Sequence, residues 1–483
     1  MTDSELYSNI KAKSITGIKW QGLAELVIRI VQFITTIILA RILVPEDFGL
    51  INIALIFTQL VYVIFDFGFS SALIQKKEVT DQHYKSVFSI LIASAIIFFG
   101  LIHICSGLIA AWFNNQDISA ILDTVSYIIF AYALHAIPQI ILMREIGFKN
   151  LSRAQLLSAI FYCFTAILLA VNGFGVYSFV YAVLGEQFFL AILLIVITGW
   201  VPKFGWNIKA IKEIIKFGSS VLGTRIAGYI SINIPNIIIG KVLGAHWLGI
   251  YSIAYQLIDF PVQRIAKMVL KVMFPAFSKL QDQLAEFKDL YKKLLYYLEL
   301  ILFPVFTGMI IIAEPFFHVI YGDKWNEAIL PFQILIGFGI LRSLWVTNSL
   351  VFLSIGKPHI EMLLDILFII ISTPVLYFAS LHGLVWLCVA LLIIFIGTWM
   401  IGMIISNRLI EMPLFSYLKT GFIPITGCLF MLGFSILTIV FWENMTVMTE
   451  LFILLILNIF VYSLIIYLLD KEVFINMKSL VRA

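Results

Sequence analysis

Residues 41–54 read Arg-Ile-Leu-Val-Pro-Glu-Asp-Phe-Gly-Leu-Ile-Asn-Ile-Ala, and residues 241–254 read Lys-Val-Leu-Gly-Ala-His-Trp-Leu-Gly-Ile-Tyr-Ser-Ile-Ala. A base, a leucine, a glycine and a final Ile-Ala recur in register between the two stretches. Similarity at a fixed period is the sequence signature of an internal repeat. The two stretches therefore predict a chain built from two related halves.

Further matches follow in the same order along both halves. Ile146-Gly147 corresponds to Ile355-Gly356, and Gly175-Val176 corresponds to Gly383-Leu384. Each match alone is weak, but their order and near-constant spacing support one repeat over most of the chain.

Apolar segments of membrane length surround these matches. A hydrocarbon core of about 30 Å requires roughly 20 apolar residues per helix. The chain has 483 residues, of which 61% are hydrophobic and 12% charged, and this fits no ordinary soluble domain. Such runs favour helices over the short alternating strands of a membrane barrel. The sequence predicts an all-α polytopic membrane protein with about fourteen spans, at 15–42, 48–75, 86–112, 119–143, 151–172, 175–200, 211–241, 247–276, 292–320, 327–355, 360–380, 383–405, 419–441 and 447–469.

Basic residues are concentrated in every second loop. Most of the 32 lysines and arginines lie in these loops or in the tails, whereas the opposite loops hold Arg41, Lys241 and Lys324. Cytoplasmic loops carry such an excess, so both termini are predicted to be cytoplasmic. The net charge of +4 therefore reflects membrane topology and does not indicate nucleic-acid binding.

An even number of spans per half gives both halves the same orientation, which is an architecture of transporters with parallel repeats. We predict an N-terminal six-helix lobe over 1–200, a cytoplasmic linker over 201–216 and a C-terminal six-helix lobe over 211–410. Residues 411–483 hold two additional helices and a cytoplasmic tail.

No enzyme, cofactor or metal motif accompanies the spans. The sequence has no G-x-x-x-x-G-K-[ST] loop for nucleotide phosphates and no H-E-x-x-H pair for zinc. The four cysteines are isolated within apolar segments, which predicts neither a disulfide framework nor a metal site; they are Cys105, Cys163, Cys388 and Cys428. We therefore expect a protein that is not an enzyme and needs no cofactor.

The informative residues are charges inside spans, because each costs at least about 2.5–3.5 kcal/mol at mid-membrane. Arg29, Arg225 and Arg342 predict a cationic cavity for an anionic ligand, since guanidinium groups match phosphate oxygens and stay charged. The alternative is internal ion pairing, of Arg29 with Glu25 or of Arg225 with Asp259.

The acidic residues allow two interpretations. Asp66, Asp259 and Glu186 are candidates for coupling to a proton or cation, with charge balancing as the alternative. Glu299 and Asp365 lie nearer the cytoplasmic span ends, where their side chains are expected to reach the interface.

The sequence resembles the polysaccharide exporters of the multidrug/oligosaccharidyl-lipid/polysaccharide superfamily. The resemblance is carried by Ala40-Arg-Ile-Leu-Val-Pro-Glu-Asp-Phe-Gly-Leu50, by Met143-Arg-Glu-Ile-Gly-Phe-Lys-Asn-Leu151, and by Gly175-Val-Tyr-Ser-Phe179 and Gly356-Lys-Pro358. It covers nearly the whole chain and is strongest for the Wzx-type flippases that export colanic acid or teichuronic acid.

The resemblance implies two six-helix lobes in a V, in the inner membrane of a bacterium, working by alternating access. It further implies transport of an undecaprenyl-pyrophosphate-linked oligosaccharide for surface or exopolysaccharide assembly, with polymerase machinery as a further partner. The alternatives are an ion-coupled drug or metabolite antiporter of the same superfamily, or a membrane polysaccharide polymerase. An antiporter would have a cavity dominated by acidic residues, whereas the central charges here include three arginines. A polymerase would need a large outer loop, and the outer loops here are short.

Overall fold

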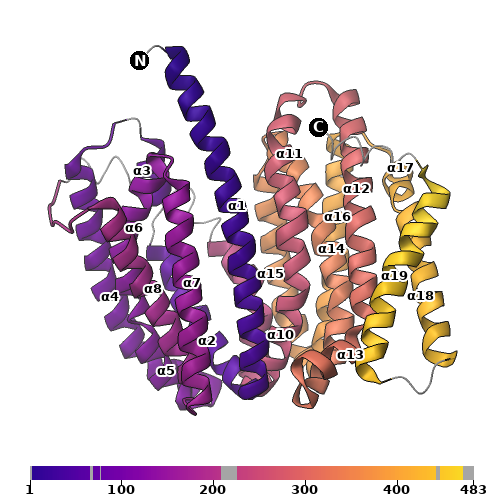
Figure 1. The fold of residues 1–483 in the computed structure, drawn as a ribbon, viewed down its shortest axis with the longest axis horizontal. Helices are drawn as coiled ribbons and strands as arrows, with labels where there is room; N and C mark the ends of the chain where they lie inside the picture. The colour runs from indigo at the N-terminus through magenta and orange to yellow at the C-terminus, as the bar shows by residue number, and fades with distance from the viewer. Residues whose placement is uncertain (1–2, 66–68, 77, 208–225, 442–445, 472–483) are drawn as a thin grey trace. The chain divides into compact units, whose positions relative to one another are not determined.

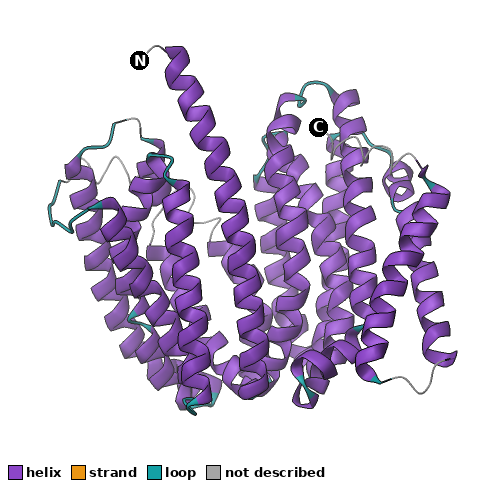
Figure 2. Ribbon diagram, viewed as in Figure 1, coloured by secondary structure: helices purple, strands orange, loops and turns teal. Residues whose placement is uncertain are grey.

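The structure is a computed structural model, and it describes residues 3–65, 69–76, 78–207, 226–441 and 446–471. Within these residues all regular secondary structure is helical, and Figure 2 shows helices joined by loops. The prediction of an all-α polytopic membrane protein is confirmed. By internal contacts the chain divides into two compact units, Met1–Asn233 with Gly244–Gly249, and Ile234–Leu243 with Ile250–Ala483.

Unit 1 begins with a long helix, α1, that packs along α7 (Figure 1). The helix α8 packs between α6 and α7, and α4 packs against α5 and α6. The described helices of this unit are α1 (Asp3–Ile42), α2 (Pro45–Phe65), α3 (Phe69–Gln75), α4 (Asp81–Phe113), α5 (Asp117–Val125), α6 (Ile128–Arg144), α7 (Phe148–Val171) and α8 (Tyr177–Thr198).

Unit 2 is centred on α14, which packs against α11, α12 and α16. Its helices are α10 (Ala245–Pro261, whose first turn belongs to unit 1), the π-helical η1 (Val262–Ala266), α11 (Lys267–Lys279), α12 (Leu284–Ile311), α13 (Ala313–Phe316), the π-helical η2 (Phe317–Tyr321), the 3₁₀-helical η3 (Asp323–Ala328), α14 (Ile329–Ser354), α15 (His359–Ser380), α16 (Leu384–Leu409), α17 (Leu414–Thr420), α18 (Phe422–Phe441) and α19 (Val447–Leu469).

The last two long helices, drawn in yellow in Figure 1, belong to unit 2. α18 and α19 pack against each other and against α12. The Tyr462 hydroxyl donates to the Leu300 carbonyl oxygen at 2.8 Å, and the Tyr296 hydroxyl donates to Asp470 at 2.7 Å. These bonds attach the end of the chain to α12.

Twelve helices of the described residues are long and apolar enough to cross a membrane. The two other predicted spans, 211–241 and 247–276, fall on shorter pieces. The first corresponds to the helix Ile226–Val242, because residues 208–225 lie outside the described part. The second is divided into α10, η1 and α11. The predicted linker 201–216 is described only to residue 207, so the predicted lobe boundaries stay predictions.

Pro261 marks the break in the span predicted over 247–276. Proline has no backbone N–H to donate, and its ring clashes with the preceding turn of a helix. The π-helical turn η1 follows it directly, at Val262–Ala266. Such turns inside helices are local distortions with an identifiable cause.

Two repeat-related glycines make a reciprocal close contact within unit 1. A Cβ added to Gly49 would overlap the backbone carbonyl of Ala245, and a Cβ added to Gly249 would overlap that of Pro45. Pro45 and Gly49 are equivalent to Ala245 and Gly249 in the repeat. Glycine allows such an approach because it lacks a Cβ. The glycine shared by the two quoted stretches is therefore required by packing.

Candidate functional site

The best-defined charged site of the described residues lies in unit 2, between α10 and α14. Arg342 Nη1 lies 2.9 Å from Asp259 Oδ1, and the same nitrogen donates to the Tyr255 hydroxyl. The guanidinium carbon also lies 5.5 Å from the Tyr255 ring centroid and 6.0 Å from that of Phe338. The Arg342 side chain is only 14% exposed and that of Asp259 is 26% exposed. The arginine is therefore held among aromatic rings and largely buried, and its carboxylate partner is the more exposed of the two.

Asp259 belongs to a polar face that continues through the π-helical turn. Gln263 Nε2 donates to Asp259 Oδ1 at 3.2 Å. Tyr255, Asp259, Gln263 and Lys267 follow one another at intervals of four residues. Lys267 interacts electrostatically with Asp259 and with Arg342.

A carboxylate on α15 extends this polar region along α14. The Ser349 hydroxyl donates to Glu361 Oε2 at 2.9 Å. Glu361 also interacts electrostatically with Lys267. Arg342, Lys267, Asp259 and Glu361 therefore form a group of two bases and two acids, which carries no net charge when all four are ionised.

In unit 1, Glu25 and Arg29 form the pair allowed by their spacing on α1. Arg29 Nε lies 3.4 Å from Glu25 Oε1, and Nη1 donates to Gln32 Oε1 at 3.1 Å. The two charged side chains are 49% and 42% exposed. Because neither side chain is buried, Arg29 keeps guanidinium surface beyond its contact with Glu25.

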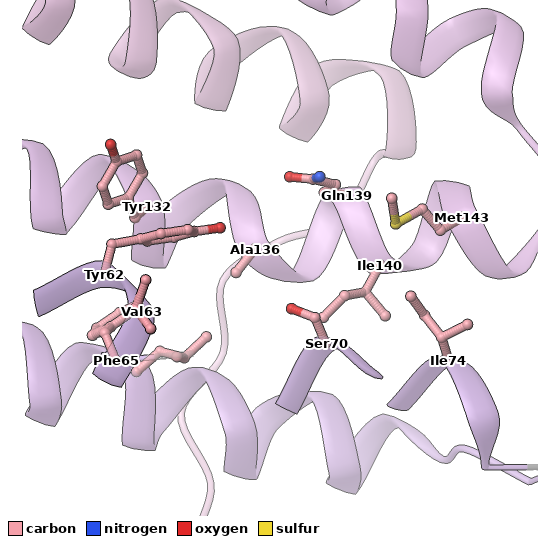
Figure 3. Close-up of a pocket in the computed structure, with 11 residues that line it drawn as sticks. Tyr62, Val63, Phe65, Ser70, Ile74, Tyr132, Ala136, Gln139, Ile140 and Met143 are labelled. Atoms are coloured by element: carbon pink, nitrogen blue, oxygen red, sulfur yellow. The ribbon is translucent and has the colours of Figure 1, made fainter. Parts of the chain in front are cut away.

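A partly open cavity of about 320 Å³ lies in unit 1. Figure 3 shows Tyr62 beside Tyr132 at one end and Met143 with Ile74 at the other. The Tyr62 and Tyr132 ring centroids are 4.3 Å apart. Glu186 of α8 interacts electrostatically with Tyr132. Hydropathy gives no signal for this cavity, because its lining residues come from four separate helices.

Arg144 has a structural position that sequence reasoning did not assign. Its Nη1 donates to the carbonyl oxygens of Leu73 and Lys76, the latter at 2.7 Å. Carbonyl groups at a helix end have no partner within the helix, and a basic side chain can satisfy them. Arg144 therefore ties the end of α3 to α6. The sequence did contain a signal for Arg144, because this residue lies in the stretch Met143–Leu151 that carries the family resemblance.

The expectation for Glu299 is wrong. Glu299 is only 3% exposed, so its carboxylate does not extend to the membrane interface. The Glu299 carboxylate instead lies beside Gly421, just before α18 begins at Phe422. Gly421 also ends α17 (Leu414–Thr420), so the Glu299 carboxylate is packed where α17 and α18 meet instead of at the expected interfacial position.

The remaining predicted site residues have different outcomes. Arg225 and Asp66 lie outside the described residues. Asp259 pairs with Arg342, which was not among the pairings expected from the sequence. Glu186 belongs to unit 1. The roles predicted for Arg29, Arg342, Glu25, Asp259 and Glu186 in ligand binding or ion coupling stay predictions.

An all-helical multi-pass membrane protein with charged groups held inside its spans belongs to the class of membrane transporters by architecture. The family described as polysaccharide biosynthesis protein matches residues 38–330, and the chain belongs to this family.

Three curated relatives cover most of the chain. It is 24% identical to the teichuronic acid biosynthesis protein TuaB of Bacillus subtilis, over 83% of this chain and 85% of the relative. It is 26% identical to the lipopolysaccharide biosynthesis protein WzxC of Escherichia coli, over 73% and 72%. It is 24% identical to the succinoglycan biosynthesis transport protein ExoT of Rhizobium meliloti, over 83% and 84%.

Two solved structures show the same fold. The lipid II flippase MurJ in an inward closed conformation matches with a TM-score of 0.74 at 16% identity, covering 94% of this chain and 99% of that one. An inward-facing multidrug resistance MATE transporter matches with a TM-score of 0.63 at 16% identity, covering 79% and 94%. At these identities the likeness establishes the fold alone.

Proposed function

We propose that this protein is a flippase that moves a polyprenyl-pyrophosphate-linked oligosaccharide from the cytoplasmic to the outer leaflet of a bacterial inner membrane, by alternating access. The observation that carries the proposal is Arg342, a guanidinium that lies near the middle of α14 and is 14% exposed. A permanent cation inside a span suits a pyrophosphate, which offers several oxygens to the guanidinium fork.

The relatives support the sugar-lipid part of the proposal. TuaB, WzxC and ExoT carry names from the biosynthesis of three different surface polysaccharides, and MurJ is named for lipid II. We infer that the cargo of this chain is likewise a sugar carried on a lipid with an anionic head group. We therefore propose the lipid bilayer and the polymerase machinery of the same polysaccharide as partners, and no catalytic role for this chain.

The direct test uses purified full-length protein in liposomes with a labelled polyprenyl-pyrophosphate oligosaccharide. We expect the label to cross the bilayer without ATP, because the sequence has no nucleotide-binding loop. Protein-free liposomes and liposomes with a heat-inactivated sample are the controls. Strict dependence on ATP, or transport of cationic drugs but not of the lipid-linked sugar, would reject the proposal.

The orientation of the chain has a separate test. Reporter fusions after Lys77, Lys209 and Lys419 should give cytoplasmic signals, and fusions at Asn114 and Asn444 should give outer-side signals. Fusions placed within the span α7 serve as the control, and we expect them to give neither a clear cytoplasmic nor a clear outer-side signal. A cytoplasmic signal at Asn444 would contradict both the predicted span count and the cytoplasmic C-terminus.

Arg29 offers a test of the second candidate cation. If it binds cargo, Arg29→Ala should abolish export while the protein remains in the membrane, and Arg29→Lys should retain part of the activity because the charge survives. The measurement is complementation of a flippase-deficient strain. The matched control is the double variant Glu25→Gln with Arg29→Gln, which removes both charges of the pair. Full activity of that double variant would show that Arg29 only balances Glu25.

A further inference from the structure

The contact between Arg342 and Asp259 means that the guanidinium already has an anionic partner before any cargo arrives. We propose that Asp259 is a built-in competitor for Arg342. The cargo pyrophosphate displaces the carboxylate on binding, and the carboxylate displaces the pyrophosphate on release. This inference rests on the proposed function, since it assigns the regulation of the same cationic site.

The geometry of the pair permits exchange. Among the described residues, both polar contacts of Arg342 use Nη1, so the edge formed by Nε and Nη2 is available for a second anion. Asp259 is the more exposed partner, at 26% against 14% for Arg342. The carboxylate is therefore the partner with more room to move away from the guanidinium when a second anion binds.

The electrostatic energies favour an exchange of anions at Arg342 over a permanent ion pair with Asp259. Arg342 cannot lose its proton, so it requires a counter-anion in every state of the cycle. A partly desolvated cation without a partner is strongly unfavourable. If Asp259 resumes the contact as the pyrophosphate departs, the arginine is never left bare, and release does not have to overcome the full strength of the ligand contact.

The displaced carboxylate also needs a partner, and Lys267 lies on the same face. In an α-helix, residues four apart drift by about 40° around the axis. A π turn holds more residues per turn and offsets this drift. The π-helical η1 lies between Asp259 and Lys267, so it keeps Lys267 aligned with the carboxylate, consistent with their electrostatic interaction. Asp259 therefore exchanges between two cations of one polar face.

The test measures binding of inorganic pyrophosphate to the purified full-length protein by calorimetry at fixed ionic strength. Asp259→Asn removes the competing charge and keeps the shape, so we expect about a tenfold gain in affinity together with a lower export rate. The matched control is Asp289→Asn in α12, which removes a carboxylate that pairs with Lys293 outside this charged group. The pyrophosphate affinity of this control variant should change by less than about threefold, which corresponds to about 0.7 kcal/mol.

Unchanged or weaker binding in folded Asp259→Asn protein would overturn the inference, and so would an equal gain in Asp289→Asn. Thermal unfolding checks that the variants are folded. If the asparagine variant does not fold, Asp259→Ser removes the same charge with a smaller side chain and is judged by the same criterion.

A double-mutant cycle with Lys267→Gln tests the exchange partner. If Lys267 receives the displaced carboxylate, its substitution should weaken pyrophosphate binding in the native background and have no effect in Asp259→Asn. Equal weakening in both backgrounds would show direct contact of Lys267 with the anion and would reject the exchange.

The liposome experiment separates this inference from the proposed function. If native protein flips the lipid-linked sugar but Asp259→Asn binds pyrophosphate with native affinity, the competitor role fails and the flippase role stands. If Asp259→Asn binds more tightly but native protein flips no lipid-linked sugar, the competition at Arg342 stands and the cargo assignment fails.

Discussion

Gly49→Ala is expected to prevent accumulation of folded protein in the membrane. The added methyl group would overlap the backbone carbonyl of Ala245, and a backbone atom cannot move aside as a side chain can. Overpacking in a well-packed region typically costs about 1–3 kcal/mol, and a backbone clash belongs at or above the upper end. Fluorescence-detected size exclusion of a tagged protein measures the folded fraction.

The repeat supplies a second variant and the structure supplies a control. Gly249→Ala should have an effect as large as that of Gly49→Ala, because its methyl group would overlap the Pro45 carbonyl. The double variant should lose less folded protein than the two single variants lose when their losses are added, because both substitutions separate the same pair of helix turns. Gly107→Ala in α4 meets no atom within 4 Å, so it should be tolerated. Equal behaviour of Gly49→Ala and Gly107→Ala would contradict the close contact.

Arg342→Ala is expected to abolish export and to lower the amount of folded protein. The substitution leaves the partly buried Asp259 with only the more distant Lys267 as a cation, and breaking a buried pair costs up to about 3–5 kcal/mol. The measurement is complementation of a flippase-deficient strain, with the membrane level of the protein determined in parallel.

A double variant separates the two effects of that substitution. Arg342→Met with Asp259→Asn removes both charges and keeps similar side-chain volumes, so the protein level should recover. Export should remain absent, because the cation for the pyrophosphate is missing. Full export by this double variant would mean that the pair serves only to hold α10 and α14 together.

The sequence alone determined the class of fold and identified Arg342 and Asp259 as charged residues within predicted spans. Long apolar runs require helices, because a membrane leaves no water to satisfy an exposed backbone. The structure confirms helices over these runs, and twelve of them are long enough to span. The quoted repeat also identified Gly49 and Gly249 as equivalent, although it did not show that they approach each other's helix.

Tertiary structure decided which charged groups meet. The spacing of Glu25 and Arg29 made their contact predictable, because residues four apart share a helix face. The partner of Asp259 was not predictable in this way, since Arg342 lies on another helix.

Other features of the site also depend on neighbours far away in the chain. Glu299 lies beside Gly421, Arg144 satisfies carbonyl groups of α3, and the cavity beside Tyr132 is lined by several helices. Hydropathy and periodicity report how each helix is exposed on average. They do not report which side chain of another helix faces a given position, because that depends on how the helices pack.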